Sequence, residues 1–216
     1  MKKLFAFLVC ALCAFMLFAC NKPAEEGGKN NDNENNQSQT ETPSEDLDKA
    51  LDAKYKSIAK DKKIYLTTIG QADVDKVQSF FDDLEMEDGK DYVKKNNLTA
   101  AEVEEGAVVF MVIGTSGKGL GAAGTDLNGE KARANAFVAK ENITLLVFHV
   151  GGLDRRGDTT DPIIDIVCPK ANLLLVVNTA NNDGKFSKIA KDNNVDLYLF
   201  SKTSKMESAI NTLLDK

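Results

Sequence analysis

Ala107-Val108-Val109-Phe110-Met111-Val112-Ile113-Gly114-Thr115-Ser116-Gly117-Lys118-Gly119-Leu120-Gly121 is the stretch that decides the fold class of this chain. Its first part is an unbroken apolar run, which is typical of a strand buried on both faces of a parallel sheet. Its second part is rich in glycine, so a ligand could approach the backbone N–H groups closely, with a helix start behind them. Helical spacing resumes from about Asn128 to Glu141. The stretch therefore predicts a strand, a glycine-rich loop and a helix, the repeating unit of an α/β domain.

The same alternation of strands and helices continues on both sides of this unit. Apolar runs predict further strands, and apolar spacings of three and four predict the helices between them. The expected fold is a three-layer α/β fold, Rossmann-like or flavodoxin-like, with a doubly wound, mostly parallel sheet of five to six strands. The expected strand order is the flavodoxin-like 2-1-3-4-5, with any sixth strand added to it. The predicted strands cover residues 63–69, 91–96, 107–113, 144–150, 172–177 and 195–200.

Capping residues mark three expected helix starts. Thr42-Pro43-Ser44-Glu45 has the pattern of a capping box, and apolar residues at helical spacing follow it, so a peripheral helix is expected over residues 45–61. Asp161 is expected to be the N-cap of a short helix, with Pro162 in its first position. Ser204-Lys205-Met206-Glu207 is a second capping box, which predicts a C-terminal helix.

The N-terminus has the pattern of a secretory signal. Lys2 and Lys3 precede an apolar core that ends in a small residue. The end of this segment, Leu17-Phe18-Ala19-Cys20, is similar to a bacterial lipobox, in which the cysteine is acylated and the chain is cut before it. We therefore expect residues 1–19 to be a lipoprotein signal peptide, and acyl chains on Cys20 to anchor the chain to the bacterial cell membrane on its extracytoplasmic side. An uncleaved single-span anchor is the alternative.

A linker is expected after the lipidated cysteine, over residues 20–44. The stretch 27–38 within it has no apolar side chain. Such a segment cannot bury enough surface to offset its chain entropy, so disorder is expected. The remaining residues 62–216 are enough for a single α/β domain with its own core.

Composition argues against several classes of function. The 216 residues carry a formal net charge of −6 without basic runs, so nucleic acid is not an expected partner. Three of the four cysteines lie near the N-terminus, so the domain has no pair for an internal disulfide. The fourth, Cys168, is expected to be buried and inert, the alternative being a reactive thiol. With one histidine and no cysteine pair, no metal site is expected.

The glycine-rich loop fails the spacing of two nucleotide-binding motifs. Walker A requires glycine five positions before Gly117-Lys118, where the chain has Val112, and a hydroxyl residue after the lysine, where it has Gly119. Residues 119–124 do spell G-x-G-x-x-G, but they begin some five residues past the strand. The next strand also lacks the terminal acid that would hold a ribose. No nucleotide cofactor is therefore expected.

The polar and glycine-rich loops all follow strands, so they should meet at the carboxyl edge of the sheet, where ligands bind in such folds. The N–H groups from Ser116 to Gly121 are expected to form an anion-binding nest, to which Lys118 adds charge. The loop also exceeds the usual length between a strand and a helix, which is typical of functional loops. The alternative is a structural loop whose glycines serve only its turns.

Two adjacent arginines, Arg155 and Arg156, lie in another of these loops. Most other basic residues are lysine, so a local arginine pair indicates bidentate recognition of a carboxylate or phosphate. The alternative is an internal salt-bridge cluster with Asp154 and Asp158.

His149 is the only histidine, and it ends a predicted buried strand. A hydrogen-bonded core histidine is one interpretation, and a ligand contact or general acid/base is the other. A triad of Ser116, His149 and Asp158 can be imagined. Gly114-Thr115-Ser116-Gly117 is not a G-x-S-x-G elbow, however, so hydrolase catalysis is not expected.

Three motifs carry a resemblance to a known family. The glycine-rich loop, the stretch His149-Val150-Gly151-Gly152-Leu153-Asp154-Arg155-Arg156-Gly157 and the tripeptide Thr160-Asp161-Pro162 resemble an exported bacterial α/β family, domain of unknown function 6305. The likeness runs from about Lys63 to the C-terminus, and the family more often has serine at the position of Thr160. The resemblance implies a Rossmann-like bacterial domain and brings no assigned activity.

Taken together, these features predict a lipid-anchored extracytoplasmic domain that binds a small anionic ligand. The alternatives are an extracytoplasmic enzyme acting on a phosphorylated or carboxylated small molecule, and a protein-interaction module of the cell envelope. The expected ligand contacts are Thr68, Ser116, Gly117, Lys118, Gly119, Gly121, His149, Arg155, Arg156 and Asp161.

Overall fold

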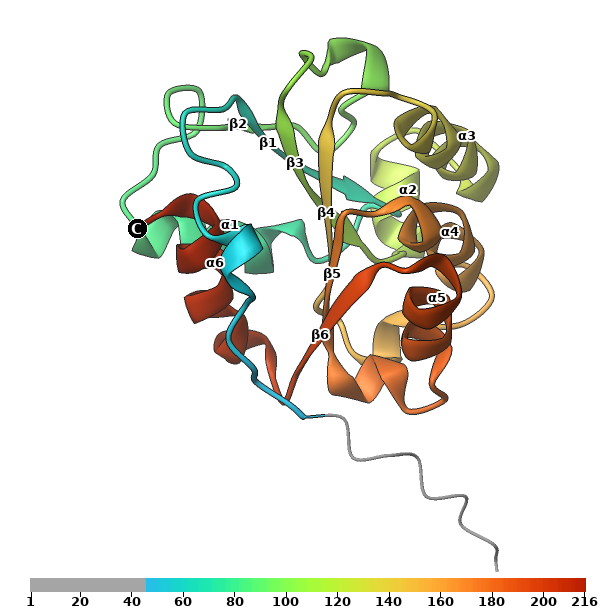
Figure 1. Cartoon of the computed structure of the whole chain (residues 1–216). Coiled ribbons are helices and arrows are strands. Elements are labelled where there is room, and N and C mark those ends of the chain that lie inside the picture. Colours follow the sequence, from blue (N-terminus) through green and yellow to red (C-terminus); the bar gives the residue numbers. More distant parts are fainter. Residues whose placement is uncertain (1–45) are drawn as a thin grey trace, which may run out of the picture. The chain divides into compact units, whose positions relative to one another are not determined.

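The computed structural model describes residues 46–216, which form a six-stranded parallel sheet (Figure 1). The strand order is β2-β1-β3-β4-β5-β6. The predicted α/β class and the 2-1-3-4-5 order are confirmed, and the sixth strand is added beside β5. The strands are β1 Ile64–Ile69, β2 Val93–Lys94, β3 Val108–Ile113, β4 Thr144–His149, β5 Leu173–Val177 and β6 Asp196–Phe200.

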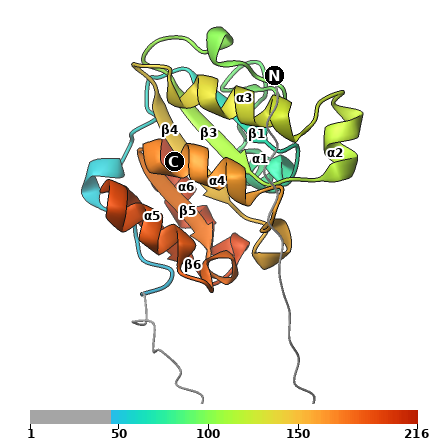
Figure 2. The same ribbon diagram turned by 90° about the vertical axis from the view of Figure 1, so that its right-hand side faces the viewer.

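Helices cover both faces of the sheet and give three layers (Figures 1 and 2). Helices α1 and α6 pack on one face, and α3, α4 and α5 pack on the other. The two faces therefore hold separate apolar cores, as expected for a doubly wound sheet. The helices are α1 Val74–Asp83, α2 Gly117–Ala122, α3 Leu127–Val138, α4 Asp161–Val167, α5 Lys185–Asn193 and α6 Glu207–Leu214.

The apolar run of β3 supplies the centre of both cores. Its six residues are all fully buried, because alternate side chains point to opposite faces and both faces are covered. Phe110 lies edge-on to Phe81 of α1 at 5.1 Å between ring centroids and stacks on Phe148 of β4 at 5.5 Å. A fully buried ring of this kind stabilises the fold by about 1.5–3 kcal/mol.

The prediction of a peripheral helix over residues 45–61 was wrong. Residues 46–60, here called the N-terminal strap, contain only a short 3-10 helix, Ala53–Tyr55, as far as the structure describes them. The strap instead bonds to β6 and α6: Asp48 N donates to Leu199 O at 2.8 Å, and Ala59 N donates to Leu213 O at 3.0 Å. These tertiary hydrogen bonds replace the intrahelical bonds that the apolar spacing predicted.

Two expected helix starts were also placed incorrectly. Asp161 is the first residue of α4 and Thr160 is its N-cap, because the Asp161 carboxylate faces the preceding loop and accepts from Gly157 N at 3.0 Å. Ser204 lies inside a 3-10 helix, Thr203–Met206, and α6 begins one turn later at Glu207. The signal peptide, Cys20, the linker and the capping box at 42–45 lie outside the described residues.

Among residues 46–216, no helix combines the length and the hydropathy that crossing a bilayer requires.

Candidate functional site

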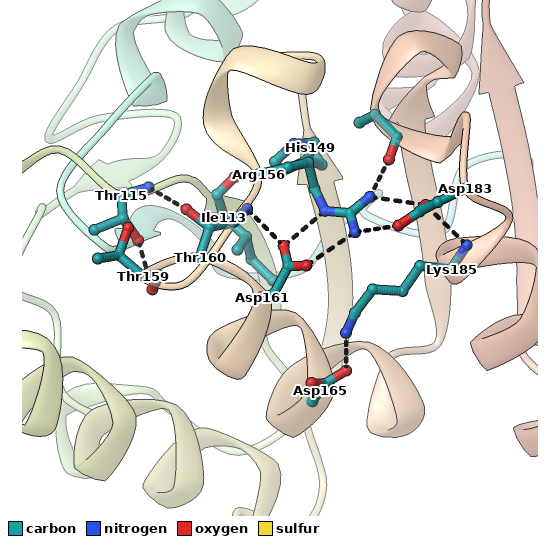
Figure 3. A network of polar contacts seen from close by, with 12 residues as sticks. Ile113, Thr115, His149, Arg156, Thr159, Thr160, Asp161, Asp165, Asp183 and Lys185 are labelled. Carbon is teal, nitrogen blue, oxygen red and sulfur yellow. Dashed lines mark hydrogen bonds and ion pairs between the residues drawn. The ribbon is translucent and has the colours of Figure 1, made fainter. Parts of the chain in front are cut away.

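The loops that follow the strands meet at the carboxyl edge of the sheet, and hydrogen bonds join them. Ser116 N donates to Gly70 O at 3.0 Å, which ties the loop after β3 to the loop after β1. Thr115 N donates to Thr160 Oγ1 at 3.1 Å, which ties it to the loop after β4 (Figure 3). The predicted convergence of these loops is therefore present, and each holds its neighbour in place.

The glycine-rich stretch is a helix in place of the expected open loop. Helix α2 covers Gly117–Ala122, and Ser116 caps it by accepting a hydrogen bond from Gly119 N at 3.2 Å. The N–H groups of Ser116 and Gly119 are therefore occupied. Those of Gly117 and Lys118 have no hydrogen-bond partner among the described residues, and both residues are exposed. The anion-binding nest predicted over residues 116–121 is reduced to these two N–H groups.

The glycines of α2 serve different purposes. A Cβ on Gly119 would lie 2.3 Å from Gln71 O, so glycine is required for α2 to pack on the loop after β1. A Cβ on Gly117 or Gly121 would meet nothing within 4 Å. Since glycine inside a helix costs about 1 kcal/mol relative to alanine, packing within the described chain does not account for these two. They leave the backbone of α2 open to close approach from outside.

Two of the predicted contacts, Thr68 and His149, are fully buried. Thr68 Oγ1 donates to Ala72 O at 2.9 Å. The His149 ring lies between two backbone carbonyls, with Nδ1 2.9 Å from Ile113 O and Nε2 3.2 Å from Gly152 O. Burial lowers the pKa of His149 below its ordinary value. Both side chains therefore support the loops from within and present no surface to a ligand, as the core interpretation of His149 expected.

Arg156 and Asp161 are taken up by an internal ionic cluster (Figure 3). The Arg156 side chain is only 6% exposed, and it pairs with Asp161 at 2.7 Å and with Asp183 at 2.8 Å. Hydrogen bonding to Arg156 lowers the pKa of both carboxyl groups. The internal-cluster alternative therefore describes Arg156, but with Asp161 and Asp183 in place of the expected Asp154 and Asp158.

Arg155, in contrast, keeps part of its guanidinium accessible. Its side chain is 39% exposed, and its Nε donates to Asp73 Oδ2 at 3.1 Å. Neither terminal nitrogen has a hydrogen-bond partner among the described residues. Lys76 Nζ lies 3.0 Å from the other oxygen of the same carboxylate. Two cations thus share one carboxylate, and the group as a whole carries an excess positive charge.

Asp73 is the residue of this site that sequence reasoning missed. Its side chain is 4% exposed, although it is charged. Its backbone is left-handed at φ 62°, and Gln71 and Gly70 before it also have positive φ. A non-glycine residue in this conformation is costly, and such residues cluster at binding sites and switches.

Two strand-ending glycines enclose the Asp73 carboxylate. A Cβ on Gly151 would lie 2.5 Å from Asp73 Oδ2, and one on Gly114 would lie 3.1 Å from it. Gly151 therefore needs to be glycine so that the carboxylate and the Arg155 side chain fit beside it, and a Cβ on Gly114 would make a tight contact with the same carboxylate. Glycine at the end of successive strands was the available sequence signal, but nothing in the sequence connects these glycines with Asp73.

The catalytic arrangement that the sequence allowed is not assembled. Ser116 Oγ caps α2, the His149 ring faces two carbonyls, and no hydrogen bond joins either of them to Asp158. Among residues 46–216, no three His, Cys, Asp or Glu side chains are placed to share a metal ion.

Comparison with known proteins gives a family and no activity. The family model described as a domain of unknown function (DUF6305) matches residues 61–214. No curated protein and no solved structure matches the chain. The matched range spans β1 to α6, which includes every loop of the carboxyl edge described above. The chain belongs to the family of domain of unknown function DUF6305.

Proposed function

We propose that this protein is a membrane-tethered extracytoplasmic lipoprotein whose α/β domain binds a small anionic ligand at the carboxyl ends of its strands. The observation that carries the binding part is Arg155, held through Nε by Asp73 while both terminal nitrogens stay free of partners in the described chain. The lipobox-like Leu17-Phe18-Ala19-Cys20 after an apolar segment supports the tether.

The way Arg155 is held favours recognition of a carboxylate or phosphate. A guanidinium fixed at Nε presents its two terminal nitrogens as a planar fork, the geometry that pairs with two oxygens of an anion. Because the side chain is already ordered by Asp73, less conformational entropy is lost when a ligand binds. Lys76 on the same carboxylate adds a second positive charge.

Binding is a better account of this edge than catalysis. The residue nominated as general acid or base, His149, is enclosed, and Arg156 and Asp161 neutralise each other. The accessible cations are Arg155, Lys76 and Lys118, and Asp154 and Asp158 are exposed in the same loop as Arg155. The three cations suit the binding of an anion.

Thermal unfolding of the purified protein in phosphate, citrate and nucleoside monophosphates tests the binding part. At ligand concentrations about 100-fold above the dissociation constant, the native state gains about 2.7 kcal/mol and the midpoint rises. Arg155→Ala should abolish the rise, and Lys90→Ala, which removes an exposed charge in the turn before β2, should not. A rise of equal size in Arg155→Ala would place the ligand elsewhere.

Membrane fractionation of bacteria that express the chain tests the tether separately. The wild-type chain should incorporate labelled palmitate and sediment with membranes. Cys20→Ala should lose the label, because the acylated sulfur is gone. Retention of the label in Cys20→Ala would contradict the lipobox assignment.

A further inference from the structure

A hollow lies at the carboxyl edge of β1, and none of the charged groups described above lines it. Its volume is about 290 Å³, and its lining differs in kind from the Arg155 site, consisting of carboxamides and very small residues. The lining residues are Gln71, Asn96, Asn97, Gly119, Ala122 and Ala123. Carboxamides provide both hydrogen-bond donors and acceptors without charge, so this hollow suits a neutral polar group.

A buried ion pair fixes the orientation of the Gln71 carboxamide. Glu130 is 1% exposed and pairs with Arg133 at 3.3 Å. Its Oε1 accepts from Gln71 Nε2 at 3.0 Å, and its Oε2 accepts from Gly70 N at 2.7 Å. Since an ionised carboxylate only accepts, the Gln71 atom that faces it is the nitrogen. The Gln71 oxygen, Oε1, is left for a ligand.

The Asn97 carboxamide is oriented by two donors. Its Oδ1 accepts from Gln71 Nε2 at 2.7 Å and from Arg133 Nη1 at 3.4 Å. Two converging donors require an oxygen at this position, so the amide nitrogen Nδ2 is on the other side. Asn97 Nδ2 has no hydrogen-bond partner among the described residues. The two carboxamides that line the hollow therefore each keep one group without a partner in the described chain, a donor on Asn97 and an acceptor on Gln71.

Helix α2 supplies the other lining residues of the hollow and packs against Gln71. Gly119 packs directly on the backbone of Gln71, where any Cβ would collide with its carbonyl oxygen. Ala122 and Ala123 also line the hollow, and their side chains are single methyl groups. Gln71 itself has a left-handed backbone, φ 63°, which is costly for a residue with a side chain and is typical of binding sites.

We propose that this hollow binds an amide group, –CO–NH–, of a small ligand. Asn97 Nδ2 donates to the carbonyl oxygen of the ligand, and Gln71 Oε1 accepts from its N–H. The methyl groups of Ala122 and Ala123 pack against the alkyl substituent of that amide. A peptide unit and the N-acetyl group of a sugar share this chemistry. The site is distinct from the Arg155 site, so it goes beyond the anion binding proposed above.

Ligand-observed NMR by saturation transfer, on the full chain purified in detergent, tests the proposal with three probes. N-acetyl-L-alaninamide and N-acetylglucosamine carry the amide, and glucose does not. One or both amide probes should receive saturation, and glucose should not. A response from the first alone identifies a peptide-type ligand, and from the second alone an acetylated sugar.

Two variants locate any binding. Asn97→Asp is nearly isosteric and replaces the donor with an acceptor, so affinity for the amide probe should fall by about tenfold or more. Asn182→Asp adds the same charge at an exposed residue after β5 and should leave binding unchanged. Ala122→Leu should abolish binding by filling the hollow while the thermal midpoint without ligand stays near that of wild type. Saturation of neither amide probe overturns the proposal, as does binding that survives in Ala122→Leu.

Discussion

Arg155 Nε donates a hydrogen bond to Asp73 Oδ2 at 3.1 Å, across 82 positions of the sequence. This contact joins the loop after β4 to the start of α1, and it lies beside Gly151, which leaves no room for a Cβ. The carboxylate is buried, but each of its oxygens faces a cation that reaches solvent. The Asp73 carboxylate holds Arg155 and Lys76 in place, because each of them pairs with one of its oxygens. Removing the carboxylate would leave both cations without their counter-charge.

Asp73→Asn isolates the effect of that charge. Asparagine tolerates the left-handed backbone as well as aspartate does and has the same size, so only the ionic contacts to Arg155 and Lys76 change. We expect a loss of about 1–3 kcal/mol in the free energy of unfolding, measured by urea denaturation, together with weaker anion binding. Asp75→Asn, at an exposed position two residues away, is the matched control and should cost much less. Equal losses in the two variants would mean that the Asp73 contacts contribute little.

The glycines of α2 give opposite predictions at neighbouring positions. Gly121→Ala should raise the free energy of unfolding by about 1 kcal/mol, because it adds helix propensity in open space. Gly119→Ala should lower it, because the new Cβ would lie 2.3 Å from Gln71 O. Thermal denaturation of both variants measures the contrast. Stabilisation in Gly119→Ala would show that α2 does not pack on Gln71.

The Arg156 cluster predicts a loss of stability in acid. Hydrogen bonding to Arg156 lowers the pKa of Asp183 in the folded chain, so the unfolded chain binds protons first as the pH falls. The stabilisation is complete above the ordinary aspartate pKa of about 3.9 and disappears as the pH drops through the lowered one. Asp183→Asn should cost about 0.5–1 kcal/mol at pH 7, since Asp183 is largely exposed, and close to nothing at pH 2.

Urea denaturation of wild type and Asp183→Asn across this pH range provides the measurement. Asp158→Asn, which removes an exposed acid in the loop before α4, serves as control and should cost much less at pH 7. A difference between wild type and Asp183→Asn that stays constant down to pH 2 would exclude the ionic explanation.

His149 predicts a titration that a single NMR signal can follow, because the chain has one histidine. Burial lowers its pKa in the folded state, so its midpoint should lie below the ordinary value of about 6.5. For a base with a lowered pKa the unfolded chain is protonated first, so stability is complete above about pH 6.5 and falls as the pH drops toward the folded-state midpoint. Titration of the ring Cε1 proton checks this. A midpoint at or above about 6.5 would show that the ring is less enclosed or is held as a double donor.

Much of the fold was predictable because the pattern of apolar residues along the chain determines it. Continuous apolar runs such as Val108–Ile113 leave few alternatives to a strand buried on both faces, and helical spacings between such runs leave few alternatives to a parallel sheet. The order of the sheet followed from the alternation of strands and helices. The glycine-rich stretch was misread because its helix propensity is poor. The Ser116 cap and packing on Gln71 outweigh that propensity, and neither is local enough to read from spacing.

The location of the candidate site could be predicted from the sequence, but the contacts between its residues could not. The edge of the sheet follows from topology, and Arg155 was singled out by its residue type. Nothing in the sequence distinguishes Arg155 from Arg156, because the difference lies in which acids surround each in space. Asp73 and Gln71 were missed for the same reason. Their importance comes from left-handed backbone and from glycines on other strands, which only the folded chain brings together.

The strap also has a consequence for how copies of this protein meet one another. Strand β6 is one edge of the sheet, and its Leu199 carbonyl already accepts a hydrogen bond from Asp48. The other edge, β2, is only two residues long and gives an incoming chain little to pair with. Open sheet edges are where β proteins join into aggregates. With part of one edge paired by the strap and the other edge kept short, the sheet offers little for the sheet of a second molecule to extend.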